Sequence, residues 1–161
     1  MKQEEILEMV ATMLPRRPIY VEGELYLERY YLAGDMNRVL RGFWPEESRP
    51  DAQESHLRDG WTHYLHCFRR PDAARDLHNH PWHGITRLLH GGYVERRSEG
   101  SREVWAGESY ELLPDTYHTI ERLLTPTVWT LFSHGPRLQG WGFMVNGSFV
   151  PNEEYLPGGM A

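Results

Sequence analysis

The residues with the clearest potential for chemistry are three histidines in the hexapeptide His-Asn-His-Pro-Trp-His, residues 78–83. Side chains of an extended segment alternate between its two faces, so residues two apart point the same way. We therefore expect His78 and His80 to aim at one spot. Neutral imidazole is a common protein ligand for divalent metals. The spacing predicts half of a mononuclear metal site, and His118 follows further along the chain.

The segments that must position these histidines have the pattern of short strands. β-Branched and aromatic residues cluster in runs bounded by turn residues, as in 25–32, 61–68 and 93–97. Many such strands predict an all-β sandwich or barrel. One helix is expected over residues 3–14, because apolar residues recur there at helical spacing and Pro15 ends the run. We expect this helix to cover one side of the barrel.

The composition limits the class of protein. A length of 161 residues suits a single domain, residues 1–161, and a net charge of −6 argues against a nucleic-acid partner. The one cysteine, Cys67, excludes an internal disulfide. No run approaches the roughly 18 apolar residues that span a bilayer, so no membrane partner is expected. The charged residues at 1–5 do not form a secretory signal, and we expect a cytoplasmic protein.

Residues 34–60 form the longest stretch without a strand pattern. A few apolar residues up to Trp44 could pack, but the part from Pro45 to Gly60 is mostly polar. A connection of this length is usually functional or mobile. We expect it to form a lid or an arm.

Around the histidines the chain resembles the cupin superfamily, whose fold is a double-stranded β-helix of the jelly-roll type. The first cupin motif is G-x5-H-x-H-x3–4-E-x6-G. His78 and His80 fill its histidine positions and Gly92 its closing glycine. Asp72 stands at the opening glycine, and the glutamate position falls on Ile85.

The second cupin motif is G-x5-P-x-G-x2-H-x3-N. It begins here at Gly107, and its histidine falls on His118. Pro114 lies one place late, and Arg122 replaces the asparagine. The two motifs are in register with each other and cover residues 72–122, which is what makes the resemblance specific.

The resemblance implies a divalent metal held by His78, His80 and His118. Since Ile85 offers no carboxylate, the ligand set is similar to that of cysteine-dioxygenase-like cupins, which favours Fe(II). Three imidazoles are equally compatible with Zn, Ni or Mn. His83 is an alternative fourth ligand if its loop bends, and otherwise an outer donor or a solvent-facing side chain.

Several neighbours of the ligands are candidate substrate-binding residues. If Ile85 lies on the inner face of its strand, Arg87 does too, and it could bind a carboxylate or phosphate. An internal salt bridge is the alternative role for this arginine. Trp82 and Tyr117 each adjoin a ligand and could wall the pocket, although Trp82 could also pack under its loop.

The strand 61–68 offers a second set of candidates. Tyr64 and His66 share one of its faces, but both faces are mixed, so the sequence leaves open which one is internal. Ser133 and His134 do not predict a hydrolase, because neighbouring strand residues point to opposite faces and no G-x-S-x-G element exists. Cys67 is expected to be a buried thiol rather than a nucleophile.

Three kinds of function are compatible with this pattern. The first is an Fe(II)-dependent dioxygenase that acts on a small polar or carboxylated molecule. The second is an isomerase, lyase or hydrolase that uses Zn or Mn as a Lewis acid. The third is a non-enzymatic cupin that binds a small ligand. The resemblance also implies a homodimer, formed through the outer strands.

Overall fold

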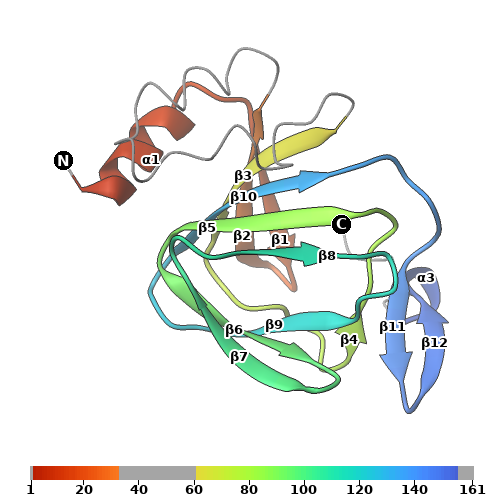
Figure 1. Ribbon diagram of the computed structural model, residues 1–161. Coiled ribbons are helices and arrows are strands. Elements are labelled where there is room, and N and C mark those ends of the chain that lie inside the picture. Colours follow the sequence, from red (N-terminus) through yellow and green to blue (C-terminus); the bar gives the residue numbers. More distant parts are fainter. Residues whose placement is uncertain (1, 33–60, 156–161) are drawn as a thin grey trace.

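The computed structural model describes residues 2–32 and 61–155 (Figure 1). Their twelve strands form two antiparallel six-stranded sheets. In spatial order the first sheet contains β1 (Arg16–Val21), β2 (Glu24–Leu32), β3 (Thr62–Phe68), β10 (Val128–His134), β5 (Gly84–His90) and β8 (Ser109–Leu112). The second sheet contains β12 (Ser148–Pro151), β11 (Gly142–Val145), β4 (Leu77–His78), β9 (His118–Leu123), β6 (Gly92–Arg97) and β7 (Gly100–Trp105).

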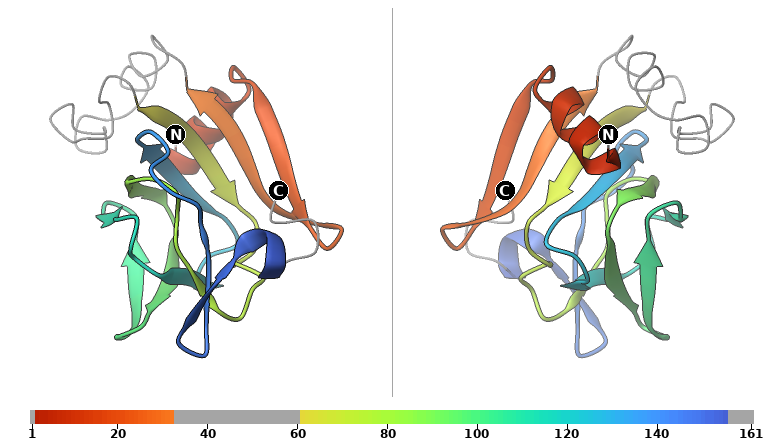
Figure 2. Two further views of the ribbon diagram at one scale, coloured as in Figure 1. Left: turned by 90° about the vertical axis from the view of Figure 1, so that its right-hand side faces the viewer. Right: turned by 90° about the vertical axis from the view of Figure 1, so that its left-hand side faces the viewer.

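The two sheets face each other and enclose an apolar core, which confirms the predicted all-β jelly roll (Figure 2). Leu88 and Val128 of the first sheet and Tyr93 and Ile120 of the second meet in this core. The strands alternate as expected, because Phe68 of β3 also faces this core while its neighbours point away. The expected lid or arm at 34–60 lies outside the described residues.

The predicted N-terminal helix is present as α1 (Gln3–Ala11), which packs on the face of the first sheet away from the second sheet (Figure 1). Its Leu7 and Val10 are fully buried there against β3 and β10. The helix is shorter than the expected 3–14, because turns replace it after Ala11. Met13 consequently lies outside the apolar stripe and is 49% exposed.

Two local features hold the site-bearing strands in register. Gly92 is required because a Cβ atom would lie 2.9 Å from the Val104 carbonyl oxygen. The two-residue strand β4 joins β9 to the hairpin of β11 and β12, which the short helix α3 (Asn152–Tyr155) follows. Neither of the described helices is long and apolar enough to cross a membrane.

Candidate metal centre

The three predicted histidines form one cluster. One ring nitrogen from each of His78, His80 and His118 lies within 4.8 Å of the others. The ring centroids are 4.9 to 5.1 Å apart. His78 and His118 are buried, and His80 is partly exposed. Three ring nitrogens at this separation could hold one divalent cation between them.

Strand pairing brings these ligands together. His78 of β4 and His118 of β9 are directly opposite each other in the second sheet. His80 lies two residues beyond His78 and reaches the same spot, as the alternation predicted. The intervening Asn79 is buried, and its amide binds backbone of two other loops, since Nδ2 donates to Pro114 O and Oδ1 accepts from Gly142 N.

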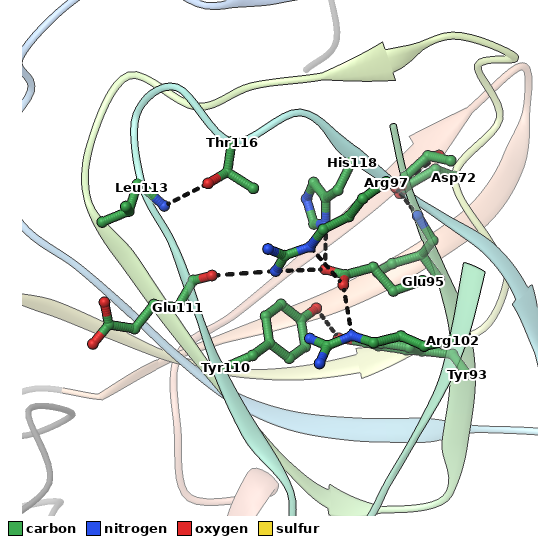
Figure 3. Close-up of polar contacts among 12 residues, drawn as sticks. Asp72, Tyr93, Glu95, Arg97, Arg102, Tyr110, Glu111, Leu113, Thr116 and His118 are labelled. Carbon is green, nitrogen blue, oxygen red and sulfur yellow. Dashed lines mark hydrogen bonds and ion pairs between the residues drawn. The ribbon is translucent and has the colours of Figure 1, made fainter. Parts of the chain in front are cut away.

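A buried carboxylate stands behind His118, and Figure 3 shows three side chains converging on it. Glu95 of β6 is fully buried, and its Oε2 accepts a hydrogen bond from His118 Nδ1 at 2.9 Å. Its Oε1 accepts from Arg97 Nε at 2.9 Å and from Arg102 Nε at 3.1 Å. Burial alone would raise the pKa of Glu95, but the hydrogen bonds from His118 and Arg97 outweigh it and lower that pKa to about 2.

The environment keeps the cluster in the form that binds metal. Burial, aided by the nearby His118, lowers the pKa of His78 to about 4. Burial, with His78 and His118 nearby, also holds the pKa of His80 well below its ordinary value. Both rings are therefore neutral at physiological pH, and neutral imidazole is the ligating form.

The residues present fit a divalent metal. His80 Nδ1 is buried and makes no hydrogen bond to any described residue, which is unusual for a buried nitrogen. On His118, Nδ1 is engaged with Glu95, so the lone pair of Nε2 remains for a ligand. Three nitrogen donors with open positions match sites for Fe(II), Zn, Ni or Mn, and do not select among them.

The cluster lies in the wall of a cavity of about 350 Å³ between the two sheets. Most of the wall is apolar or aromatic, and it includes Ile19, Leu27, Phe68, Leu112, Phe132 and Trp141. Such a lining leaves the polar groups in the cavity as the determinants of what binds.

Arg29 of β2 brings positive charge into this cavity. Its Nε donates to His66 Nε2 at 3.0 Å, and its guanidinium lies 4.4 Å from the centroid of the Tyr64 ring. Burial, followed by the charge of Arg29, keeps the pKa of His66 well below its ordinary value. Among the described residues, no carboxylate pairs with Arg29.

A second group of polar residues lines another part of the cavity. Tyr26 donates a hydrogen bond to Asp72 Oδ1, whose other oxygen accepts from Ile120 N at 2.7 Å. The hydroxyls of Tyr93 and Tyr110 hydrogen bond to each other. Burial, reinforced by Asp72, raises the pKa of Tyr26 well above its ordinary value, so this phenol is protonated at neutral pH.

Part of the predicted substrate set reaches this cavity. His66 and Trp82 line it, and Trp82 stacks on His80 with ring centroids 4.9 Å apart. Tyr64 is not in the wall, but it stacks on His66 with ring centroids 5.5 Å apart. The face of β3 that carries Tyr64 and His66, which the sequence left open, is therefore the internal one.

The conditional placement of Ile85 and Arg87 on the inner face is wrong. Thr86 lines the cavity and Leu88 enters the inner core, so the neighbours of these residues point outward. Leu89, on the outward face, packs under α1. Arg87 is absent from the cavity wall, and Arg29 takes the position that was expected for it.

His83 and Tyr117 also lie elsewhere. His83 packs edge-on against Trp61, with its Nε2 3.4 Å from Glu111 Oε2, and it is not part of the histidine cluster. Tyr117 is partly exposed and does not line the cavity. His83 is therefore not placed as a fourth ligand, and Tyr117 does not form a wall of the pocket.

Comparisons with known proteins place the fold. No family model and no curated protein matches the sequence. A cupin 2 conserved barrel domain protein from Rhodopseudomonas palustris is similar in structure, with a TM-score of 0.55 and 11% identity over 83% of this chain and 79% of that chain. A cupin-superfamily sugar phosphate isomerase from Silicibacter pomeroyi gives a TM-score of 0.51 and 11% identity over 82% and 78%.

A structure of Fe(II) HppE is also similar, with a TM-score of 0.50 and 11% identity over 76% of this chain and 57% of that chain. At these identities the similarity shows the fold and not the reaction. The chain thus has the cupin fold, as the sequence motifs implied. Its cluster of three histidines suggests a divalent metal site within that fold.

Proposed function

We propose that this protein is a mononuclear metalloenzyme of the cupin fold that acts on a small anionic molecule. The observation that carries the proposal is the group of three ring nitrogens within 4.8 Å of one another, in the wall of an aromatic cavity. His78, His80 and His118 would hold the cation. A divalent cation there would supply positive charge for a substrate oxygen and, as Fe(II), redox chemistry with dioxygen.

The anionic character of the substrate follows from Arg29. A guanidinium in a largely apolar cavity is costly unless it has an anionic partner. Among the described residues it contacts a neutral histidine, His66, and the face of Tyr64, which stacks on His66 outside the cavity wall. A carboxylate or phosphate of the substrate would provide the partner, in a geometry that guanidinium binds well. Arg29 therefore replaces Arg87 as the proposed anion-binding residue.

The first candidate reaction is an Fe(II)-dependent dioxygenation. Three neutral ligands leave the full charge of the cation available to an anionic substrate, with positions left for dioxygen. Leu27, Phe68 and Phe132 would offer an apolar surface to the rest of the substrate. This protein would then belong to the class of small-molecule oxygenases.

A second candidate is a Lewis-acid reaction such as isomerisation or elimination with Zn or Mn. The observation that favours it is the hydrogen bond from Tyr26 to Asp72 in the cavity wall. Such a pair can take a proton from a substrate, because the phenol oxygen can accept it while the phenol hydrogen passes to the Asp72 carboxylate, and the reverse transfer returns it. Such a reaction needs no oxygen, which separates it from the first candidate.

Metal analysis of untagged protein tests the proposal, because nine native histidines and a nickel column would confound a tagged sample. The wild type should carry close to one equivalent of metal, and His78→Ala/His118→Ala should carry none. His90→Ala, which changes a histidine away from the cluster, is the matched control and should keep the metal. Absence of metal in the wild type, even after reconstitution, would contradict the proposal.

The identity of the metal and its dependence on oxygen then separate the two candidates. Iron, together with oxygen consumption when small carboxylates are added, supports the dioxygenase. Zinc or manganese, with turnover under anaerobic conditions, supports the Lewis-acid reaction. In either case Arg29→Gln should weaken binding of the anion at least tenfold, while Arg87→Gln should leave it unchanged. A protein that binds metal and anion without turnover would be a non-enzymatic cupin.

A further inference from the structure

The three-histidine cluster lacks a carboxylate ligand, yet a carboxylate lies directly behind it. Glu95 has no exposed side-chain surface and contacts His118 through a 2.9 Å hydrogen bond to Nδ1. Figure 3 shows the other two polar partners of the same carboxylate, with Arg97 beside His118 and Arg102 on the other side. Glu95 is therefore held in place by donors from three side chains and is not a loosely placed surface acid.

We infer that Glu95 is a positioning residue that fixes His118 as a metal ligand and supplies negative charge to the site through it. The inference rests on the proposed metal function and names a residue outside the ligand set. Because Oε2 accepts the Nδ1 hydrogen, His118 is held in the tautomer whose Nε2 lone pair is free. A carboxylate in this position also makes the imidazole a stronger donor to a cation.

The two carboxylate oxygens of Glu95 have different hydrogen-bond partners, and this difference makes the inference testable. Oε1 accepts from both Arg97 Nε and Arg102 Nε, whereas Oε2 accepts the His118 hydrogen and a longer contact of 3.4 Å from Arg97 Nη2. In the isosteric variant Glu95→Gln, the single oxygen should turn toward the two arginines. The amide NH₂ would then face His118 Nδ1 and donate to it. His118 would be forced into the other tautomer, with a hydrogen on Nε2.

The matched control is Glu121→Gln. Glu121 lies on β9, the strand of His118, but it is half exposed and contacts Ser101 and Arg96. Both substitutions replace a carboxylate by an amide of the same shape. They differ in whether the changed group touches a proposed ligand.

The experiment combines two measurements on each variant. Nitrogen-15 NMR of the metal-free protein gives the tautomer of His118, and titration with Co²⁺ alone gives the dissociation constant. We expect Glu95→Gln to move the hydrogen of His118 from Nδ1 to Nε2 and to raise the Co²⁺ dissociation constant about 10- to 100-fold. Glu121→Gln should match the wild type in both. An unchanged tautomer with a dissociation constant within twofold of wild type would overturn the inference.

A second variant keeps the test decisive if Glu95→Gln does not fold. Arg102 is half exposed and contributes one of the donors to Oε1. In Arg102→Gln the Glu95 carboxylate loses one cationic partner, so its negative charge should act more strongly on His118. Co²⁺ should then bind about threefold more tightly. Unchanged or weaker binding would count against the role of Glu95. A wild type that binds no Co²⁺ would instead overturn the proposed metal function itself, so the two failures are distinguishable.

Discussion

The two faces of β3 and β10 show how one sheet can serve packing on one side and chemistry on the other. The outer face, under α1, presents side chains that are at most 2% exposed, namely Leu65, Cys67, Trp129 and Leu131. The inner face lines the cavity with His66, Phe68, Thr130 and Phe132. Both faces are buried, so burial alone does not separate structural residues from functional ones.

The difference lies in the kind of polar group that each face buries. On the outer face, the cost of burying the Cys67 thiolate raises its pKa to about 12, which leaves an inert thiol. On the cavity side, imidazoles, a guanidinium and hydroxyls are buried or half-buried, and the Thr130 hydroxyl makes no hydrogen bond to a described residue. Such groups are tolerated where a metal or ligand completes their interactions. Variants on each side of the sheet test whether the two faces are independent.

The largest expected effect comes from the outer face. Leu7 of α1 is fully buried in the outer cluster, so Leu7→Ala should lower the free energy of unfolding by about 2–5 kcal/mol. The Co²⁺ dissociation constant should stay within twofold of wild type. Denaturant unfolding and metal titration measure the two quantities. Met9→Ala on the same helix is the control and should change stability by less than about 0.5 kcal/mol, since Met9 is 38% exposed. A tenfold change in metal affinity in Leu7→Ala would show that the faces are coupled.

The next effect belongs to His78, which lines the same cavity from the second sheet, and it depends on pH. The pKa of His78 is about 4 in the folded, metal-free protein and near 6.5 when unfolded, so the unfolded chain binds a proton first on acidification. Stability is therefore lost as pH falls from about 6.5 to 4, by roughly 2 kcal/mol at pH 5 from this residue alone.

Denaturant midpoints at pH 7.5 and pH 5 measure this loss. His78→Gln, which keeps a polar side chain but does not titrate, should show a shallower dependence on pH. Equal midpoints for the wild type at the two pH values would contradict the prediction.

The smallest effect has the opposite sign. The hydroxyl of Thr130 is buried in the cavity wall and makes no hydrogen bond to a described residue. Thr130→Val removes this group at nearly constant volume and should stabilise the ligand-free protein by about 1 kcal/mol. Thr125→Val should destabilise it instead, because the Thr125 hydroxyl donates to Thr127 O at 2.7 Å. Thermal unfolding of the two variants checks the contrast. Equal destabilisation in both would show that the Thr130 hydroxyl has a partner such as bound water.

Local sequence spacing predicted what depends on local geometry. The all-β sandwich or barrel followed from strand and turn signals, and the ligand pair His78 and His80 followed from alternation along one extended segment. The jelly roll in particular was implied by the resemblance to cupins. The placement of Ile85 and Arg87 on the inner face came from the glutamate position of the cupin motif and not from alternation. Alternation continued from His78 and His80 would have put Thr86 and Leu88 on the inner face, where the structure has them.

The residues that the sequence did not reveal depend on partners from distant strands. Glu95 shares one face of β6 with Tyr93 and Arg97. A carboxylate on the same face as a buried aromatic residue was the signal of a functional role that the sequence offered. Nothing local indicates that His118 lies beside it. Arg29 likewise needed the register of β2 and β3, which pairs it with His66. Periodicity predicts which face of a strand a residue occupies. It does not predict which residues of distant strands lie across the cavity from it, because that depends on the tertiary structure.

The pairing of β4 with β9 also determines when a metal could enter the protein. His78 and His118 meet only after these two strands, which belong to opposite halves of the motif region, have found each other. Contacts between such distant segments form late, because closing the intervening chain costs entropy. A nascent or partly folded chain would therefore present at most the local pair His78 and His80 as a weak chelate. Metal selection would be made by the finished barrel, after synthesis, from the ions available in its compartment.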